Sequence, residues 1–161
     1  MDYTFWEIDE GFVTSLPPGL FYEIVMDVFF NARHYVVVGG RTGPIHSHSY
    51  RLQVACRSWS LTEQEHIIVG YAPLRERLEQ VVEAYNNHLL NELPPFRRLQ
   101  PTTENLAAVL FQQLSHVLKD LPIKLISVTV WESPTISITI GYQEAMEHFD
   151  GHVSALTPNG R

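Results

Sequence analysis

Two long segments in the first third of the chain alternate apolar and polar residues with the two-residue period of a β-strand. In residues 20–34 the apolar side chains occupy even positions, namely Tyr22, Ile24, Met26, Val28 and Phe30. Residues 46–57 repeat this pattern with Tyr50, Leu52, Val54 and Cys56. Because successive side chains of a strand point to opposite faces, each segment is predicted to be a half-buried strand with one face in the core.

The pattern changes in the middle of the chain to the three- and four-residue spacing of amphipathic helices. A first helix is predicted from Ala72-Pro73 to a stop at residues 92–95, with an apolar stripe of Leu74, Leu78, Val81, Val82, Tyr85 and Leu89. A second is predicted to begin in residues 101–104, where Thr102 or Thr103 can cap it, and to end before Pro122. Its stripe consists of Leu106, Val109, Leu110, Leu114 and Val117.

Two further strands are predicted at residues 124–132 and 135–142, and the apolar segment 65–71 is either a short strand or the end of a connection. The order β, β, (β), α, α, β, β predicts an α+β fold, in which an antiparallel four-stranded sheet carries two helices on one face. The other face is predicted to be polar, with Arg51, Gln53, Arg57, Ser127 and Thr129. Closure of such sheets into a barrel in an oligomer would protect their edges.

The same patterns divide the chain into a domain at residues 20–142 and two extensions. Residues 1–19 end in a Pro-Pro-Gly stop and form either a segment packed near the domain or a disordered tail. Residues 143–161 are predicted to be a short helix and a tail. This helix carries His148 and His152 at i, i+4 spacing, which a solvated pair explains more simply than a metal site.

Composition narrows the class of protein. The 161 residues are 45% hydrophobic and 18% charged, as in an ordinary soluble globular domain. A formal charge of -7 argues against binding to nucleic acid, and no apolar run reaches the roughly 20 residues of a membrane span. The acidic N-terminus lacks a signal peptide's basic region, and a single cysteine, Cys56, fits a reducing compartment. We therefore expect a cytoplasmic protein.

Three histidines fall on the apolar face of the first two predicted strands: His34, His46 and His48. Three imidazoles around an open fourth position are a common catalytic zinc arrangement, whereas core histidines without a metal would each need hydrogen-bond partners. Glu132 ends the apolar face of the strand at 124–132. A carboxylate there needs an arginine, a ligand or a backbone nest as partner.

These residues resemble four motifs of the 6-pyruvoyl-tetrahydropterin synthase / 6-carboxytetrahydropterin synthase family, in the family's order. Residues 30–34 (FNARH) resemble its F-x-A-x-H strand end, and residues 46–50 (HSHSY) its H-G-H strand. Residues 101–105 (PTTEN) resemble its P-T-x-E-N helix start, and residues 131–135 (WESPT) its W/K-E-T/S-P strand end. The resemblance extends over residues 20–142.

The resemblance implies a tunnelling fold and a homohexamer, in which two trimers stack so that their sheets close a barrel. It implies Zn2+ at His34, His46 and His48. It also implies a small pterin molecule anchored by Glu132 between subunits, with contributions from Thr102, Thr103 and Glu104. The implied activity is that of a lyase acting on 7,8-dihydroneopterin triphosphate or a close pterin, in tetrahydropterin or queuosine biosynthesis.

The acid/base residues of the family are missing from this chain. The family's cysteine, four residues before H-G-H, corresponds to Thr42, and its Asp-His pair corresponds to Asn86 and Asn87. His88, one position later, is the nearby titratable residue, so Thr42 and His88 are the catalytic candidates. Two hypotheses follow: a zinc-dependent pterin lyase with altered acid/base residues, or a catalytically inactive relative that serves as a zinc-containing pterin-binding or scaffold protein. A zinc hydrolase of an unrelated kind is a third hypothesis.

Overall fold

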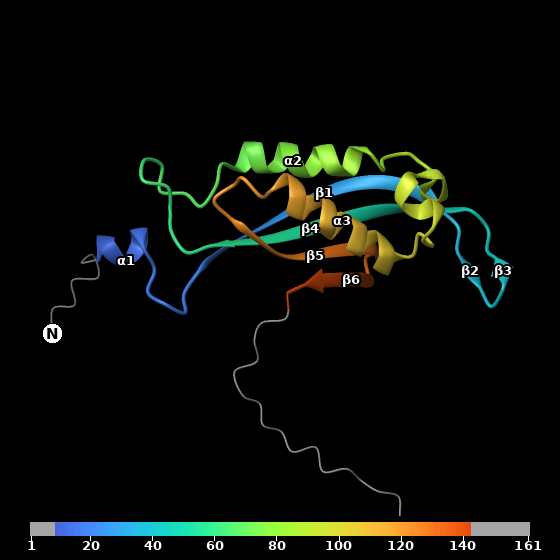
Figure 1. Cartoon of the computed structure of the whole chain (residues 1–161), viewed down its shortest axis with the longest axis horizontal. Helices are drawn as coiled ribbons and strands as arrows, with labels where there is room; N and C mark the ends of the chain where they lie inside the picture. Colours follow the sequence, from blue (N-terminus) through green and yellow to red (C-terminus); the bar gives the residue numbers. More distant parts are fainter. Residues whose placement is uncertain (1–8, 143–161) are drawn as a thin grey trace, which may run out of the picture.

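The computed structural model describes residues 9–142 of the chain, and its centre is one antiparallel four-stranded sheet (Figure 1). The strands lie in the order β1-β4-β5-β6, with bounds Tyr22–His34, His46–Ser58, Lys124–Ser133 and Ile136–Gly141. The helices α2 (Tyr71–Glu83) and α3 (Thr103–Val117) cover one face, with α2 against β1 and α3 against β5 and β6. The predicted α+β fold is therefore confirmed.

The core lies between this sheet face and the two helices. Its sheet side is formed by the even-numbered residues, as the alternation predicts; they include Val28, Phe30, Tyr50, Leu52, Val54, Val128 and Val130, all at most 2% exposed. The helices contribute the predicted stripe residues Leu74, Leu78, Leu106, Leu110 and Leu114. Cys56 belongs to this core, and burial, together with the charge of Glu23, raises the pKa of its thiol to about 12.

The first helix ends earlier than predicted, at Glu83 instead of in residues 92–95. The chain leaves the helix because the next residues bind the exposed edge of β1: the Asn86 side-chain oxygen accepts from the Asn31 backbone N–H at 3.0 Å. The Arg33 N–H in turn donates to the His88 carbonyl at 2.9 Å. Two short 3-10 helices follow, η1 (Leu90–Glu92) and η2 (Pro94–Arg97).

Two other local features differ from the prediction. Residues 65–71 are not a strand: the Ile67 carbonyl accepts from the Thr62 N–H in a loop, and residue 71 already begins α2. Between β1 and β4 the chain forms a small hairpin of β2 (Val37–Val38) and β3 (Arg41–Thr42). Its turn consists of Gly39 and Gly40, which both have positive φ (58° and 76°), as two-residue hairpin turns require.

The terminal extensions are described only in part. Residues 9–19 include the short helix α1 (Glu10–Thr14), and the Tyr22 hydroxyl donates to the Val13 carbonyl at 2.6 Å. The predicted C-terminal helix with His148 and His152 lies outside the described residues. None of the helices in the described range has the length and apolar content that a membrane crossing needs.

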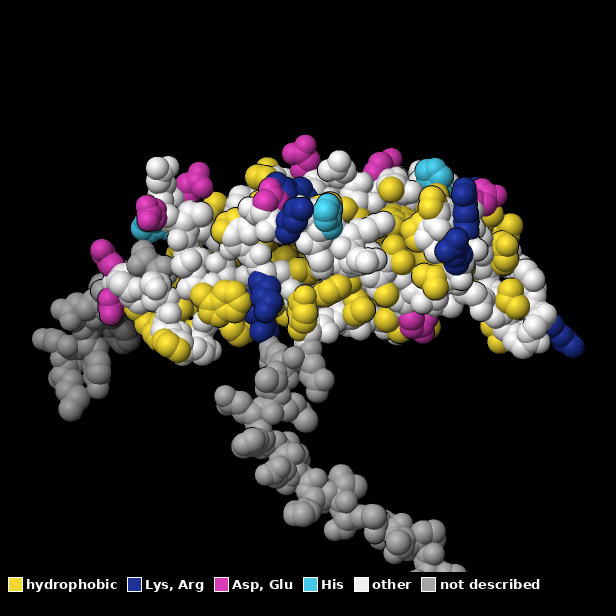
Figure 2. Space-filling model, viewed as in Figure 1, with side chains coloured by type: hydrophobic (Ala, Val, Ile, Leu, Met, Phe, Trp, Pro, Cys, Tyr) yellow, Lys and Arg dark blue, Asp and Glu magenta, His cyan; other side chains and the backbone are white. Residues whose placement is uncertain are grey.

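The sheet face opposite the helices is less polar than predicted. It carries the ion pairs Arg51–Asp27 (2.9 Å) and Arg57–Glu23 (2.7 Å), but also Phe29, which is 69% exposed. Figure 2 shows one side of the molecule, where apolar, acidic and basic side chains are interspersed. This side has no broad basic area of the kind that binds polyanions.

Candidate metal centre

The three histidines meet because of the register between β1 and β4. His34 lies directly opposite His46, and His48 pairs with Ala32 two residues further along the same face of β4. The ring centroids are 4.4 Å apart for His34 and His46, 5.1 Å for His34 and His48, and 4.9 Å for His46 and His48. The alternation of the two strands thus gathers three imidazoles at one end of the sheet.

Backbone carbonyls fix the protonation of two of these rings. The Nδ1–H of His34 donates to the Pro101 carbonyl at 2.7 Å, and the Nδ1–H of His46 donates to the Pro44 carbonyl at 3.0 Å. A carbonyl oxygen only accepts, so in the neutral ring Nε2 carries the lone pair. Burial lowers the pKa of His34, although the Pro101 carbonyl opposes this effect. Burial thus favours the neutral imidazole of His34, and the two carbonyl contacts leave the Nε2 lone pairs of His34 and His46 available to a metal.

Glu132, near the end of β5, completes the cluster. Its Oε1 lies 3.1 Å from Nε2 of His48, and its Oε2 accepts a hydrogen bond from the Thr103 hydroxyl. One potential ligand atom from each of His34, His46, His48 and Glu132 lies within 4.8 Å of the others. Among the described residues this is the group that can hold a metal ion.

The donor set fits a divalent metal. The Nε2 atoms of His34 and His48 are buried and have no hydrogen-bond partner among the described residues. A buried polar atom without a partner is costly and rare, so two of them facing a shared space need a common explanation. A metal ion bound by nitrogen and carboxylate ligands would satisfy both atoms at once.

A cavity of about 220 Å³ opens beside the cluster. Its lining consists of His34, Val36, His46, Thr102, Thr103, Glu104, Glu132, Ile136 and Ile138. Thr102 is the N-cap of α3, and its side-chain oxygen accepts from the Asn105 N–H at 3.3 Å. The amino end of α3 therefore borders the cavity, which favours ligands with negative or hydrogen-bond-accepting groups.

The structure places Thr102, Thr103, Glu104 and Glu132 in this cavity, but not the two catalytic candidates. Thr42 lies on the exposed β2–β3 hairpin, and His88 is exposed with its Nδ1 donating to the Asn86 carbonyl at 2.8 Å. Neither residue belongs to the cavity lining of the described chain. Both stay predictions for an oligomer, in which a neighbouring chain contributes to each site.

Sequence reasoning missed the groups that orient the cluster. The carbonyls of Pro44 and Pro101 could not be identified, because any residue supplies a carbonyl. The sequence pattern places Tyr50 only in the core, yet its ring centroid lies 5.5 Å from that of His48, and its buried hydroxyl has no partner among the described residues. Burial, together with the charge of Glu132, raises the pKa of this phenol. Its position in the H-S-H-S-Y run was the available signal.

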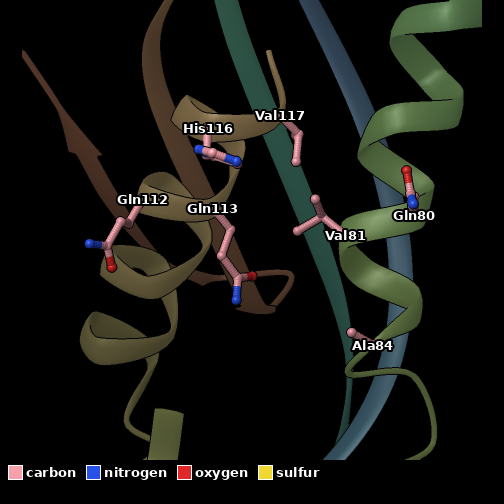
Figure 3. A pocket seen from close by; sticks show the side chains of 7 residues that line it. All are labelled: Gln80, Val81, Ala84, Gln112, Gln113, His116 and Val117. Atoms are coloured by element: carbon pink, nitrogen blue, oxygen red, sulfur yellow. The ribbon is translucent and has the colours of Figure 1, made fainter. Parts of the chain in front are cut away.

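A second hollow lies on the helical side of the molecule, between α2 and α3 (Figure 3). Its lining combines three glutamines and His116 with the apolar side chains of Val81, Ala84 and Val117. This hollow has one titratable side chain, the exposed His116, and none of the metal-binding residues described above. The cavity at the end of the sheet, beside the His/His/His/Glu group, is therefore the candidate functional site.

Fold and site together define the class: an α+β protein with a His/His/His/Glu group at one end of an antiparallel sheet. Residues 23–143 match the model of the 6-pyruvoyl tetrahydropterin synthase family. The match extends over most of the chain, and the chain belongs to this family. No curated protein matches the sequence significantly.

Solved structures share the fold. The 6-pyruvoyl tetrahydropterin synthase of Caenorhabditis elegans is 20% identical with a TM-score of 0.68, over 77% of this chain and 97% of that one. A catalytic-residue mutant of the Plasmodium vivax synthase, with a glutamate changed to alanine, is 17% identical with a TM-score of 0.61, over 78% and 99%. An uncharacterized Wolinella succinogenes protein is 17% identical with a TM-score of 0.62, over 77% and 99%.

Proposed function

We propose that this chain is a zinc-dependent pterin-binding lyase, which acts on 7,8-dihydroneopterin triphosphate or a related pterin with acid/base residues unlike the family's usual set. The observation that carries the proposal is the position of Glu132. Its carboxylate lines one cavity with His34 and His46, and it belongs with these two residues and His48 to a group whose potential ligand atoms lie within 4.8 Å of one another. A pterin ring and a metal-bound side chain need that combination of groups.

Glu132 is suited to anchor the ring. A carboxylate can accept two parallel hydrogen bonds from the 2-amino group and the adjacent ring N–H of a pterin, which is the stronger, bidentate kind of contact. Ile136 and Ile138 line the same cavity and offer apolar contact to a flat ring. Thr102, Thr103 and Glu104, at the start of α3, are the proposed polar contacts.

Proton transfer needs a group in the cavity. A bound zinc would act as a Lewis acid and acidify the side-chain hydroxyls of the substrate. Besides Glu132, Glu104 is the carboxylate of the cavity lining, and it is exposed. The Plasmodium vivax protein is described with a glutamate as a catalytic residue. For this chain we propose Thr42 and His88, contributed by a neighbouring chain, as the acid/base groups, and Glu104 remains a proposed substrate contact.

The proposal includes the family's assembly as a dimer of trimers, in the cytoplasm. The position of β1 supports it, because this strand lies at the edge of the sheet and its Val25 (51% exposed) and Phe29 (69% exposed) present apolar surface. Exposed strand edges in natural proteins are usually covered or paired.

A catalytically inactive pterin-binding or scaffold protein is the second candidate. The observation that favours it is the use of Asn86 and Asn87, the positions of the family's Asp-His pair. Asn86 accepts from the Asn31 N–H, and the Asn87 N–H donates to the Asn31 carbonyl. These residues hold the end of α2 to β1, which is a structural role that needs no titratable group.

Product analysis separates the two candidates. Zinc-loaded protein is incubated with 7,8-dihydroneopterin triphosphate, and the products are identified by liquid chromatography and mass spectrometry beside a His46→Ala control. Loss of triphosphate or cleavage of the side chain that requires the metal supports the lyase. A substrate that binds and is recovered unchanged supports the inactive protein, and absence of binding contradicts both.

The Glu132→Gln variant is expected to lose pterin binding while the three histidines still hold metal. The neutral amide removes the charge and replaces one acceptor with a donor, so the loss amounts to roughly 1.5–3 kcal/mol for a hydrogen bond to a charged group. Titration with 7,8-dihydroneopterin, followed by pterin fluorescence, measures it. Glu92→Gln, at the exposed end of η1, is the matched control. Equal affinity in wild type and Glu132→Gln would exclude Glu132 as the anchor.

A further inference from the structure

The distance between Glu132 and His48 is that of two ligands on the same metal ion. Zinc binds nitrogen and carboxylate ligands at about 2.0–2.1 Å in a tetrahedron, which places neighbouring ligand atoms about 3.3 Å apart. Oε1 of Glu132 lies 3.1 Å from Nε2 of His48. The carboxylate is therefore already at ligand distance from one histidine of the cluster.

This contact is not a hydrogen bond. Nε2 of His48 has no hydrogen-bond partner in the described structure, although Oε1 of Glu132 lies only 3.1 Å away. A His–Glu ion pair would align an N–H with the carboxylate, since hydrogen bonds weaken steeply when bent. Two atoms that bind the same metal ion also lie close together, but each directs a lone pair at the ion, so no N–H points from one atom to the other.

The surroundings of Glu132 orient its carboxylate for this role. The Thr103 hydroxyl donates to Oε2, and Thr103 itself is only 6% exposed, so one oxygen is held and Oε1 is left toward the histidines. Metal-binding carboxylates commonly have such a hydrogen-bonded second oxygen. The carbonyls of Pro101 and Pro44 orient the rings of His34 and His46 in the same way.

We propose that Glu132 is the fourth protein ligand of the metal when no pterin is bound. Three neutral imidazoles and one carboxylate close the tetrahedron, and they lower the net charge of a bound divalent ion to +1. Four protein ligands are typical of structural zinc, whereas catalytic zinc keeps one position open. The side chains of Glu132 and His48 are still 27% and 20% exposed, so the carboxylate is not locked into the core.

A consequence follows that rests on the proposed function. If the same carboxylate anchors the pterin ring, a pterin must draw Glu132 away from the metal before its own hydroxyls can bind there. Ligand binding would then open the coordination position, and the free protein would keep its metal closed to other small molecules. Glu132 would serve as a substrate-operated gate.

Cobalt substitution of the full-length protein tests the coordination. Co2+ in a closed four-ligand site is expected to give an intense visible spectrum that azide does not change. In Glu132→Ala an open position lets azide bind and alter the spectrum, and metal affinity falls at least tenfold. Glu104→Gln, in the same cavity but outside the cluster, is expected to match the wild-type cobalt spectrum. Thr103→Val, which keeps the carboxylate but frees it, is expected to show an intermediate azide response.

The outcomes test separately whether Glu132 is the fourth ligand and whether a pterin displaces it. An azide response in the wild type as large as that in Glu132→Ala would overturn the fourth-ligand assignment. With a closed wild-type site, a spectral change on addition of 7,8-dihydroneopterin supports the gate. If the wild-type site is closed and pterin binds without changing the cobalt spectrum, the gate is contradicted but the fourth-ligand assignment is not. If the wild-type site is closed but fluorescence detects no pterin binding, the fourth-ligand assignment holds and the proposed function is contradicted.

Discussion

Replacement of His46 by alanine is expected to abolish stoichiometric zinc binding. His46 supplies one of three imidazole nitrogens, and the remaining His34, His48 and Glu132 leave a position that only water can fill. Loss of an outer partner of a metal ligand already costs roughly 10–100-fold in affinity, and loss of the ligand itself should exceed that. Metal content after dialysis against a weak competing chelator, measured by atomic emission, gives the result.

His116→Ala is the matched control, because His116 is an exposed histidine in the hollow between α2 and α3 (Figure 3). It should keep one zinc per chain. Circular dichroism of both variants checks that the fold persists, as expected when a residue at the strand end is shortened. One zinc per chain in folded, dialysed His46→Ala protein would exclude His46 as a ligand.

Among the substitutions proposed here, replacement of Leu110 by alanine is expected to lower the free energy of unfolding the most. Leu110 lies on α3, is 0% exposed and packs in the core between α3 and the sheet. Truncation of a buried leucine removes apolar contacts and leaves a cavity, at a cost of about 2–5 kcal/mol in the free energy of unfolding. Equilibrium urea denaturation, with chelator present so that metal binding does not contribute, measures the change.

Leu99→Ala serves as the comparison, because the same side chain is 47% exposed there. Its unfolding free energy should stay within about 0.5 kcal/mol of the wild-type value, as for most surface substitutions. Both variants are measured at one protein concentration, since oligomer formation links stability to concentration. Similar losses for Leu110→Ala and Leu99→Ala would contradict the described core.

The sequence predicted the sheet and the stripes of both helices because each rests on a periodic burial pattern. Residues such as Val28 and Leu52 are forced inward by strand parity alone, and Thr102 caps α3 as its hydroxyl and position suggest. The end of α2 could not be predicted in this way. Tyr85 continues the apolar stripe and is buried, but the helix ends before it because Asn86 accepts a hydrogen bond from the Asn31 N–H and the Asn87 N–H donates to the Asn31 carbonyl, on a strand distant in sequence.

The candidate site likewise contains residues that the sequence pattern predicts and a contact that it does not. The parity of His34, His46 and His48 was visible in the sequence, and the register of β1 with β4 brings the three together. The approach of Glu132 to His48 depends on the pairing of β5 with β4 and on the Thr103 hydroxyl, so no local pattern contains it. Side chains that meet across strands far apart in sequence are set by tertiary packing, which a single sequence does not display.

The positions of the four clustered side chains along the chain have a further consequence. His34 ends the first strand of the sheet and Glu132 lies near the end of the third, with both helices between them in sequence. An ion bound by both would act as a reversible cross-link that closes a long loop, and such links remove conformational freedom from the unfolded chain. Metal supply in the cell would then influence how long each molecule survives proteolysis, whatever reaction the site performs.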